Sequence, residues 1–435
     1  MNTNKTFKRV TKGGKKFNLL TFPNSNFFKF EITNLYGSNI ERVIESKTGK
    51  NLYGISHFVE HLAFKSPKDF TTKELMDIAK NEGTYNASTN QDRINYWFQT
   101  TMDNLDLGIK FVCNVAQNDF MKVNEEEFNT EKNVVYNEAK KAWDNHQVMF
   151  YRNARTKMLG YHQEDNNIGV PETISKFTLE DAIAVKNIFL NNNQNIYNIT
   201  YDNTLISEDE VIEKIEKELA RFKVGSKPIF DISDEEYRAK LKYPANQEFK
   251  LESEAKQAMT SIVIDGIDHT IVGDASLFYL ARLAPDTSLN ELIREKNGLT
   301  YHIYFYQTLI SYKPYINFAC DVTVGNESKL IELFKESINL SADNFNKEKY
   351  ERYMKSMKLK RTMANLNMVA HNIWFRYDYR ASSELDEFRD ILSNNIDEGY
   401  EYIDNNIVTY EAMNESIQKI RALVNSGAFA KVSTH

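Results

Sequence analysis

Cysteine and long apolar runs are both scarce in this chain of 435 residues, and each shortage excludes a class of protein. The two cysteines, Cys113 and Cys320, fall one in each half, so the sequence contains no disulfide framework. Cys113 lies on an apolar helical stripe, where a small buried hydrophobic residue is expected instead of a catalytic thiol.

No apolar run approaches the length of a membrane span, so we expect no membrane partner. The N-terminus has neither an apolar signal region nor an arginine-rich amphipathic helix, and residues 16–22 already have the pattern of a strand. We therefore expect a cytoplasmic protein. Basic clusters such as residues 12–16 are short and the net charge is −7, so nucleic acid is not an expected partner.

Length and composition favour an ordinary globular protein with more than one core. Hydrophobic residues make up 41% of the chain and charged residues 26%. At 435 residues the chain is too long for a single core and suits two domains. A charged segment with Gly225, Pro228 and Pro244 separates the halves. We expect an N-terminal domain at 1–225, a linker at 226–245 and a C-terminal domain at 246–435.

Strand-like and helix-like runs alternate in both halves. The predicted strands lie at 27–32, 94–98 and 196–200 in the first half and at 260–264 and 316–322 in the second, with long helices near 328–341 and 346–380. This interleaving predicts an α+β fold class, in which each sheet is covered on one side by helices.

His57, Glu60 and His61 form the most unusual pattern in the chain, H-x-x-E-H. On a helix the two histidines stand at i and i+4, so both imidazoles point from one face toward one ion. Glu60 shares that face and is placed to take a proton from an attacking water. The alternative is a solvated face with three polar residues, but with only 8 histidines such a pattern arises by chance in roughly one chain in a hundred. The opposite side carries an apolar stripe formed by Ile55, Phe58, Val59 and Leu62.

Two such histidines need at least one further protein ligand, usually a carboxylate. Glu131 and Glu138 fall in a helix-like segment and, on a helical wheel, inside its apolar stripe. The stripe is formed by Phe128, Val134, Val135 and Ala142. A buried ionised carboxylate is costly unless it is paired or bound to a cation, whereas two acids on a solvated face would lie opposite the valines. We therefore predict Glu138 as the third metal ligand and Glu131 as the acid that orients a histidine or the metal.

These residues together resemble the pitrilysin, insulysin and mitochondrial-processing-peptidase family of zinc endopeptidases. In that family the H-x-x-E-H pattern precedes a glutamate by about 75 residues, which fits Glu138. The segment 83–96 is similar to the family's Gly-x-x-Asn-Ala-x-Thr edge strand. The resemblance implies that Asn86 and Ala87 bind the substrate backbone, and that His57, His61 and Glu138 hold one Zn²⁺ per chain.

A second motif supports the resemblance. The segment 293–301 is similar to the family's R-E-K-x-G-L-x-Y motif, which implies that Arg294 and Tyr301 hold the substrate carbonyl and backbone. The chain departs from many relatives at 283–289, where it lacks a glycine-rich stretch. The resemblance implies two related α/β sandwich domains, each a mostly antiparallel sheet covered by helices, in a clamshell dimer.

The resemblance predicts a zinc-dependent endopeptidase that cleaves extended, unfolded peptides inside a closed chamber, for peptide maturation or turnover. We expect a homodimer with sites completed in trans, or a heterodimer with a related subunit. Two alternatives stay open. One is a non-catalytic peptide-binding subunit, as occurs in this family when the zinc set is lost. The other is an iron oxygenase with two histidines and one carboxylate, which leaves Glu60 and Arg294 without a role.

Overall fold

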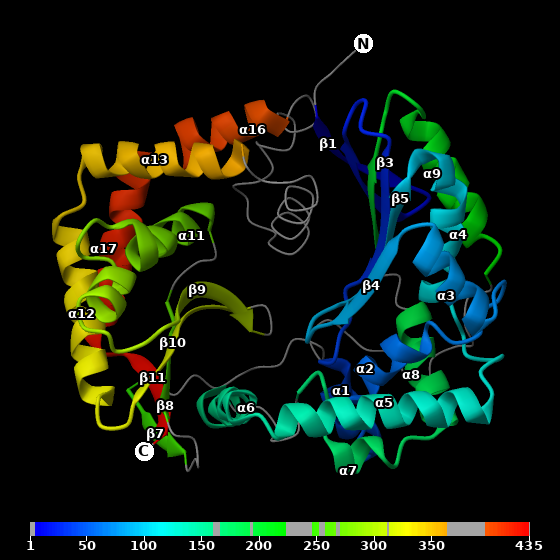
Figure 1. Ribbon diagram of the computed structural model, residues 1–435, viewed down its shortest axis with the longest axis horizontal. Coiled ribbons are helices and arrows are strands. Elements are labelled where there is room, and N and C mark those ends of the chain that lie inside the picture. The colour runs from blue at the N-terminus through cyan, green and yellow to red at the C-terminus, as the bar shows by residue number, and fades with distance from the viewer. Residues whose placement is uncertain are drawn as a thin grey trace. The chain divides into compact units, whose positions relative to one another are not determined.

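The computed structural model describes residues 5–159, 166–191, 195–222, 246–251, 257–266, 270–310, 313–362 and 396–434. The chain forms two compact units, each built on one β-sheet with packed helices (Figure 1). The mixed α+β class predicted from the sequence is confirmed. The predicted linker at 226–245 lies outside the described residues. No helix within them is both long and apolar enough to cross a membrane.

The first unit contains a six-stranded sheet in the order β1-β2-β6-β3-β5-β4. Among these strands β2 and β6 are parallel and the other neighbours are antiparallel, as expected for a mostly antiparallel sheet. β4 forms one edge, so one side of its backbone has no neighbouring strand among the described residues. The strands are β1 (Thr6–Lys12), β2 (Lys15–Thr21), β3 (Phe27–Asn34), β4 (Thr84–Thr89), β5 (Ile94–Thr101) and β6 (Asn195–Tyr201).

Alternating side chains fix which face of this sheet carries the helices. Along β5, Ile94, Tyr96 and Phe98 are buried while the residues between them are half-buried. Phe98 packs against Phe111 of α4 with ring centroids 4.5 Å apart, and α4 in turn contacts α9 (Figure 1). Cys113 of α4 is fully buried, as predicted. The helices of this unit are α1 (Ile40–Thr48), α2 (Ile55–Leu62), α3 (Thr72–Asn81), α4 (Leu105–Ala116), α5 (Glu125–Trp143), α7 (Pro171–Ile174), α8 (Leu179–Asn191) and α9 (Glu208–Leu219).

The second unit contains a five-stranded sheet in the order β7-β11-β8-β10-β9, in which β9 forms one edge. β7 and β11 are parallel and the other neighbours are antiparallel. The strands are β7 (Glu248–Leu251), β8 (Gln257–Ile264), β9 (Ile303–Ile310), β10 (Lys313–Thr323) and β11 (Phe429–Thr434). The helices after residue 246 are α11 (Ile271–Phe278), α12 (Glu327–Asp343), α13 (Lys347–Thr362), α16 (Ile396–Tyr402) and α17 (Tyr410–Ser426). Of the helix predicted at 346–380, the part beyond Thr362 lies outside the described residues.

One helix departs from the predicted domain boundaries. α6 (His146–Leu159) falls within the predicted N-terminal domain, but its contacts place it in the second unit. One side of α6 shares a core with β8, β10 and β11, formed by Phe150, Ala154, Met158, Met259, Val263, Tyr315, Ala430 and Val432. Phe318, whose side chain alternates with that of Tyr315 across the sheet, packs against Phe334 of α12 on the opposite face. The second sheet therefore carries helices on both faces, not on one as the sequence predicted.

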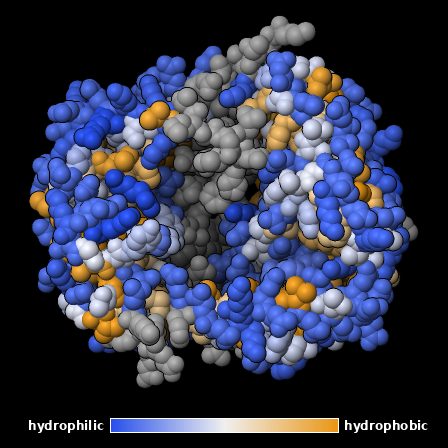
Figure 2. All heavy atoms as spheres, in the orientation of Figure 1, coloured by the Kyte–Doolittle hydropathy of each residue, from blue (hydrophilic) through white to orange (hydrophobic). Residues whose placement is uncertain are grey.

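Burial of apolar side chains in the two units leaves a mainly polar exterior on the face in view. Figure 2 shows hydrophilic residues over most of this face, with apolar residues in small separate groups. Exposed apolar side chains scattered in this way are ordinary for a folded protein.

Candidate metal centre

The helix α2 carries the H-x-x-E-H pattern and is fixed against the core by its apolar side. Its four stripe residues are Ile55, Phe58, Val59 and Leu62, all at 0% exposure. Phe58 packs edge-on against Phe128 of α5, with ring centroids 5.3 Å apart. The predicted apolar stripe is confirmed, and it holds the two histidines on the other side of the helix.

The start of α2 is held by a residue that the sequence did not reveal. Glu41 of α1 is fully buried, and its two carboxylate oxygens accept hydrogen bonds from the backbone N–H groups of Gly54 and Ser56, both at 2.8 Å. Gly54 has φ 96°, and a Cβ there would lie 2.5 Å from the Cα of Gly169. Glu41 thus satisfies free N–H groups of the helix and places negative charge at its positive end.

His57, His61 and Glu138 converge on one point, as predicted. The two Nε2 atoms lie 3.2 Å apart, and Oε2 of Glu138 lies 3.8 Å from His57 Nε2 and 3.5 Å from His61 Nε2. Ligand atoms bound tetrahedrally to zinc at their usual distances are separated by about 3.3 Å. Within the described part of the chain, this is the one cluster of histidine, cysteine and acidic side chains suited to a metal ion. The donor types and the spacing of these three residues fit zinc.

Glu131 fixes the orientation of His61. Its Oε1 lies 2.8 Å from His61 Nδ1, and its Oε2 lies 2.6 Å from Nζ of Lys65. Burial pushes the pKa of the Glu131 carboxyl upward, but the hydrogen bonds with His61 and Lys65 outweigh this and hold that pKa below its ordinary value. An ionised carboxylate at Nδ1 keeps the proton on that nitrogen, so Nε2 presents its lone pair to a metal.

The two histidines differ in protonation. Burial, together with the positive charge of His61, lowers the pKa of His57 to about 3, so His57 is neutral at ordinary pH. Its Nδ1 is buried, and no described residue forms a hydrogen bond with it. Burial also acts to lower the pKa of His61, but the bond to Glu131 and the charges of Glu138 and Glu60 outweigh it and raise that pKa. The negative charges of Glu60, Glu131 and Glu138 therefore stabilise a proton or a metal cation bound beside the imidazole of His61.

Glu60 lies beside this cluster with its carboxyl buried. Its exposure is 8%, and burial raises the pKa of the carboxyl against the opposing hydrogen bond from Thr89. The Thr89 hydroxyl donates to Glu60 Oε2 at 2.5 Å. A carboxyl with a raised pKa suits a group that must both accept and release a proton near neutral pH.

The buried stripe of α5 differs from the prediction. It consists of Phe128, Glu131, Val135 and Ala139. Val134 is 40% exposed and the side chain of Glu138 is 45% exposed, although both were predicted to face inward. The expectation was wrong because positions 134 and 138, one turn apart, lie on the flank of the helix beyond its apolar stripe. Glu138 therefore reaches the histidines from the solvent side, and only Glu131 is the predicted buried acid.

Asn86 and Ala87 lie on β4, at the edge of the first sheet, as the resemblance implied. Their strand partners on β5 are Trp97 and Tyr96. Asn86 is exposed and Ala87 is half-buried. Their contact with a substrate stays a prediction.

Arg294 and Tyr301 lie in the second unit and contact each other. The Arg294 guanidinium stands 4.8 Å from the centre of the Tyr301 ring, and the Tyr301 side chain is 70% exposed. Tyr304 and Tyr306 of β9 are also exposed, at 44% and 46%. The resemblance implied that Arg294 and Tyr301 hold the substrate carbonyl and backbone, which stays a prediction. Their approach to the metal-binding residues stays a prediction.

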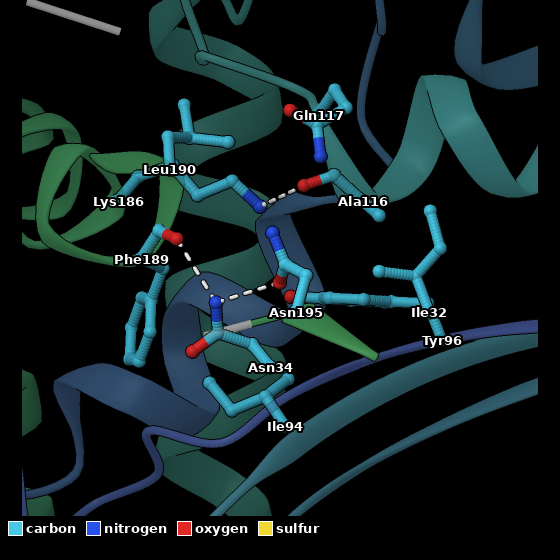
Figure 3. A pocket seen from close by; sticks show the side chains of 10 residues that line it. All are labelled: Ile32, Asn34, Ile94, Tyr96, Ala116, Gln117, Lys186, Phe189, Leu190 and Asn195. Atoms are coloured by element: carbon cyan, nitrogen blue, oxygen red, sulfur yellow. Dashed lines mark hydrogen bonds between the residues drawn. The ribbon is translucent and has the colours of Figure 1, made fainter. Parts of the chain in front are cut away.

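A separate buried cluster surrounds Lys186 of α8 (Figure 3). Burial lowers the pKa of Lys186 to about 7, and its ammonium donates a hydrogen bond of 2.9 Å to the carbonyl of Ala116, at the end of α4. The space beside it has a volume of about 20 Å³, which suits a single water. Lys186 therefore serves as a cap for the last turn of α4.

Comparisons with known proteins agree with these features. The insulinase family model, peptidase family M16, matches residues 47–172, and the model of the peptidase M16 inactive domain matches residues 205–357. An uncharacterized zinc protease of Rickettsia felis is 25% identical over 271 residues, which are 59% of this chain and 61% of that protein. The zinc protease PqqE of Helicobacter pylori is 31% identical over 131 residues, 29% of each chain. The chain thus matches less than two thirds of the length of either relative.

A solved structure has the same fold. The crystal structure of a peptidase M16 inactive domain from Pseudomonas fluorescens aligns with a TM-score of 0.74, covering 98% of this chain and 97% of that chain at 12% identity. At this identity the likeness concerns the fold alone. It extends over both units of the chain.

Proposed function

Because this chain belongs to the insulinase family of peptidases, M16, we propose that it is a zinc-dependent endopeptidase for extended peptides. The observation that carries the proposal is the convergence of His57 Nε2, His61 Nε2 and Glu138 Oε2 beside the buried carboxyl of Glu60. Relatives in Rickettsia felis and Helicobacter pylori are called zinc proteases, which supports the same chemistry.

The chemistry follows from the roles of these side chains. His57, His61 and Glu138 would hold a zinc ion, which would supply a Lewis acid that lowers the pKa of water toward about 7 and polarises a carbonyl. Glu60 accepts a proton from the water that attacks the scissile carbonyl carbon. As the C–N bond breaks, Glu60 delivers this proton to the leaving amine nitrogen. Glu131 keeps His61 in the tautomer that leaves Nε2 free.

The substrate is proposed to bind as an added strand along β4. An edge strand has backbone groups free to pair with an extended chain, and such pairing reads backbone more than side chains. Asn86 and Ala87 lie on this strand, and Thr89 at its end contacts Glu60. The proposed substrates are therefore unfolded or extended peptides, and the processes served are peptide maturation or turnover.

We also propose that the active form is a homodimer that encloses a chamber, with each zinc site completed by Arg294 and Tyr301 of the partner subunit. A heterodimer with a related subunit is the alternative. Mixing the inactive variants Glu60→Gln and Arg294→Ala tests this, because one of the two sites in a mixed dimer would carry no substitution. Regained cleavage supports the homodimer, and mixed dimers without activity argue against it.

A second candidate function is a non-catalytic peptide-binding subunit. The observation in its favour is that the model of the peptidase M16 inactive domain matches residues 205–357. The residues proposed to bind zinc lie outside that range, so the match does not argue against a catalytic role for them. Binding of a labelled peptide without any cleavage would favour this candidate.

The deciding experiment measures cleavage of a quenched fluorescent peptide with and without a chelator. We expect cleavage that stops with chelator and returns with added Zn²⁺, and metal analysis that finds zinc, not iron. Glu60→Gln should retain zinc and lose turnover. A matched control is Glu127→Gln on α5, whose carboxylate binds the hydroxyls of Ser66 and Thr72. Full activity of Glu60→Gln, or cleavage that chelator leaves unchanged, would refute the proposal.

A further inference from the structure

We propose that Thr89 is a positioning residue for the general base Glu60, an inference that rests on the proposed peptidase function. The Thr89 hydroxyl lies 2.5 Å from Glu60 Oε2, and the two residues are 7% and 8% exposed. Glu60 is thus held by a strand that is distant from α2 in sequence.

A single hydroxyl hydrogen can serve only one carboxylate oxygen. Its donation to Oε2 occupies one acceptor site of that oxygen and leaves both lone pairs of Glu60 Oε1 available for the proton of the attacking water. The bond also restricts the rotation of a side chain with several free torsions. Threonine suits this purpose, because its branched Cβ restricts χ1 and so fixes the direction of the hydroxyl.

The backbone of Thr89 is itself fixed from two sides. Thr89 pairs with Ile94 of β5, and the turn between them is closed by a hydrogen bond of 2.8 Å from Asn90 N to the Arg93 carbonyl. The Asn167 side chain donates to the Thr89 carbonyl at 2.8 Å. The hydroxyl that meets Glu60 therefore projects from a well-held position.

The same strand carries the two residues proposed to bind the substrate backbone, Asn86 and Ala87. A displacement of β4 would therefore move the bound substrate and the Thr89 hydroxyl by the same amount. Thr89 therefore keeps the general base in register with the bound peptide. If the hydrogen bond between Thr89 and Glu60 were purely structural, its loss would lower the free energy of unfolding but would not selectively lower kcat.

The test compares Thr89→Val, which keeps the shape and removes the hydroxyl, with Thr89→Ser, which keeps the hydroxyl. Misplacement of a catalytic group costs up to about 100-fold in rate, so we expect Thr89→Val to lower kcat by about 10- to 100-fold. We expect KM within about threefold, with zinc content unchanged, because no substrate or metal ligand is removed. Thr89→Ser should retain most of kcat. Thr101→Val, on the exposed end of β5, is the matched control.

A double variant separates positioning from general weakening. In a Glu60→Gln background, Thr89→Val should produce little further loss of the residual rate, because both changes act through one carboxyl. An undiminished further loss would overturn the inference, as would a Thr89→Val enzyme with wild-type kcat or with kcat lost only in proportion to zinc. If Thr89→Val does not fold, Thr89→Ala against Thr89→Ser gives the same comparison. Wild-type protein without chelator-sensitive cleavage would instead refute the proposed function.

Discussion

The contact between Glu131 and His61 yields a quantitative prediction for zinc affinity. In Glu131→Gln the amide oxygen can still accept from His61 Nδ1, but the negative charge behind the imidazole is lost. Lys65, now 2.6 Å from Glu131 Oε2, would lose its ionic partner and place an unbalanced positive charge beside the site. Loss of such an orienting partner raises the Kd for a metal by about 10- to 100-fold. This equals about 1.4 to 2.8 kcal/mol.

The assay is a competition titration of metal-free protein with a chromophoric zinc chelator at pH 7. Glu127→Gln is the matched control, since it makes the same substitution one turn earlier on α5 and its carboxylate binds Ser66 and Thr72. We expect the control to bind zinc like the wild type. A Glu131→Gln protein with a Kd within twofold of the wild type would refute the orienting role. An equal rise in both variants would mean that the effect comes from the charge of the helix as a whole.

Three further predictions follow from the same contacts. Glu138→Gln should lower zinc affinity more than Glu131→Gln does, because it removes a ligand, and the same titration would contradict this by giving the reverse order. Glu41→Gln keeps one oxygen acceptor, so it weakens one hydrogen bond and replaces the other with an amide NH2 that faces a backbone N–H. Denaturant unfolding should therefore show a loss of about 2 to 4 kcal/mol, and a loss below about 1 kcal/mol would contradict this. Lys186 has a folded pKa of about 7. Its unfolded pKa is about 10.4, so between these values the unfolded state binds more protons and the wild type should gain stability over Lys186→Met as pH rises, by up to about 1.4 kcal/mol per pH unit. A difference that stays flat from pH 7 to about 10 would contradict the burial argument.

Local periodicity was sufficient to predict the elements that carry the proposed metal ligands. The stripe opposite His57 and His61 is buried, and the strands predicted from strand-like runs of residues all form. The family resemblance is confirmed by the two matched family models. These features depend on residues close together in sequence, whose spacing fixes which face they share.

The features that the sequence did not reveal depend on contacts between distant segments. Glu41 accepts hydrogen bonds from backbone N–H groups at the start of α2. Every residue but proline has such a group, so the sequence does not indicate which of them a distant side chain will bind. The apolar side of α6 gave no indication of which sheet it would cover. The error at Glu138 has a related cause: apolar neighbours such as Val134 indicate a stripe, but not where the stripe ends. Only the packed structure decides that limit.

The unequal support of the two histidines follows from how α5 meets α2. α5 contacts His61 through both ring nitrogens, with Glu131 at Nδ1 (2.8 Å) and Glu138 at Nε2 (3.5 Å). His57 Nε2 lies 3.8 Å from Glu138, and burial keeps the His57 imidazole neutral. Among the residues that the structure describes, none forms a hydrogen bond with its Nδ1. Because Glu131 and Glu138 are two turns apart on one helix, any movement of α5 changes both contacts of His61 at once. The position of α5 therefore affects both contacts of His61, whereas His57 meets α5 only through the longer contact with Glu138.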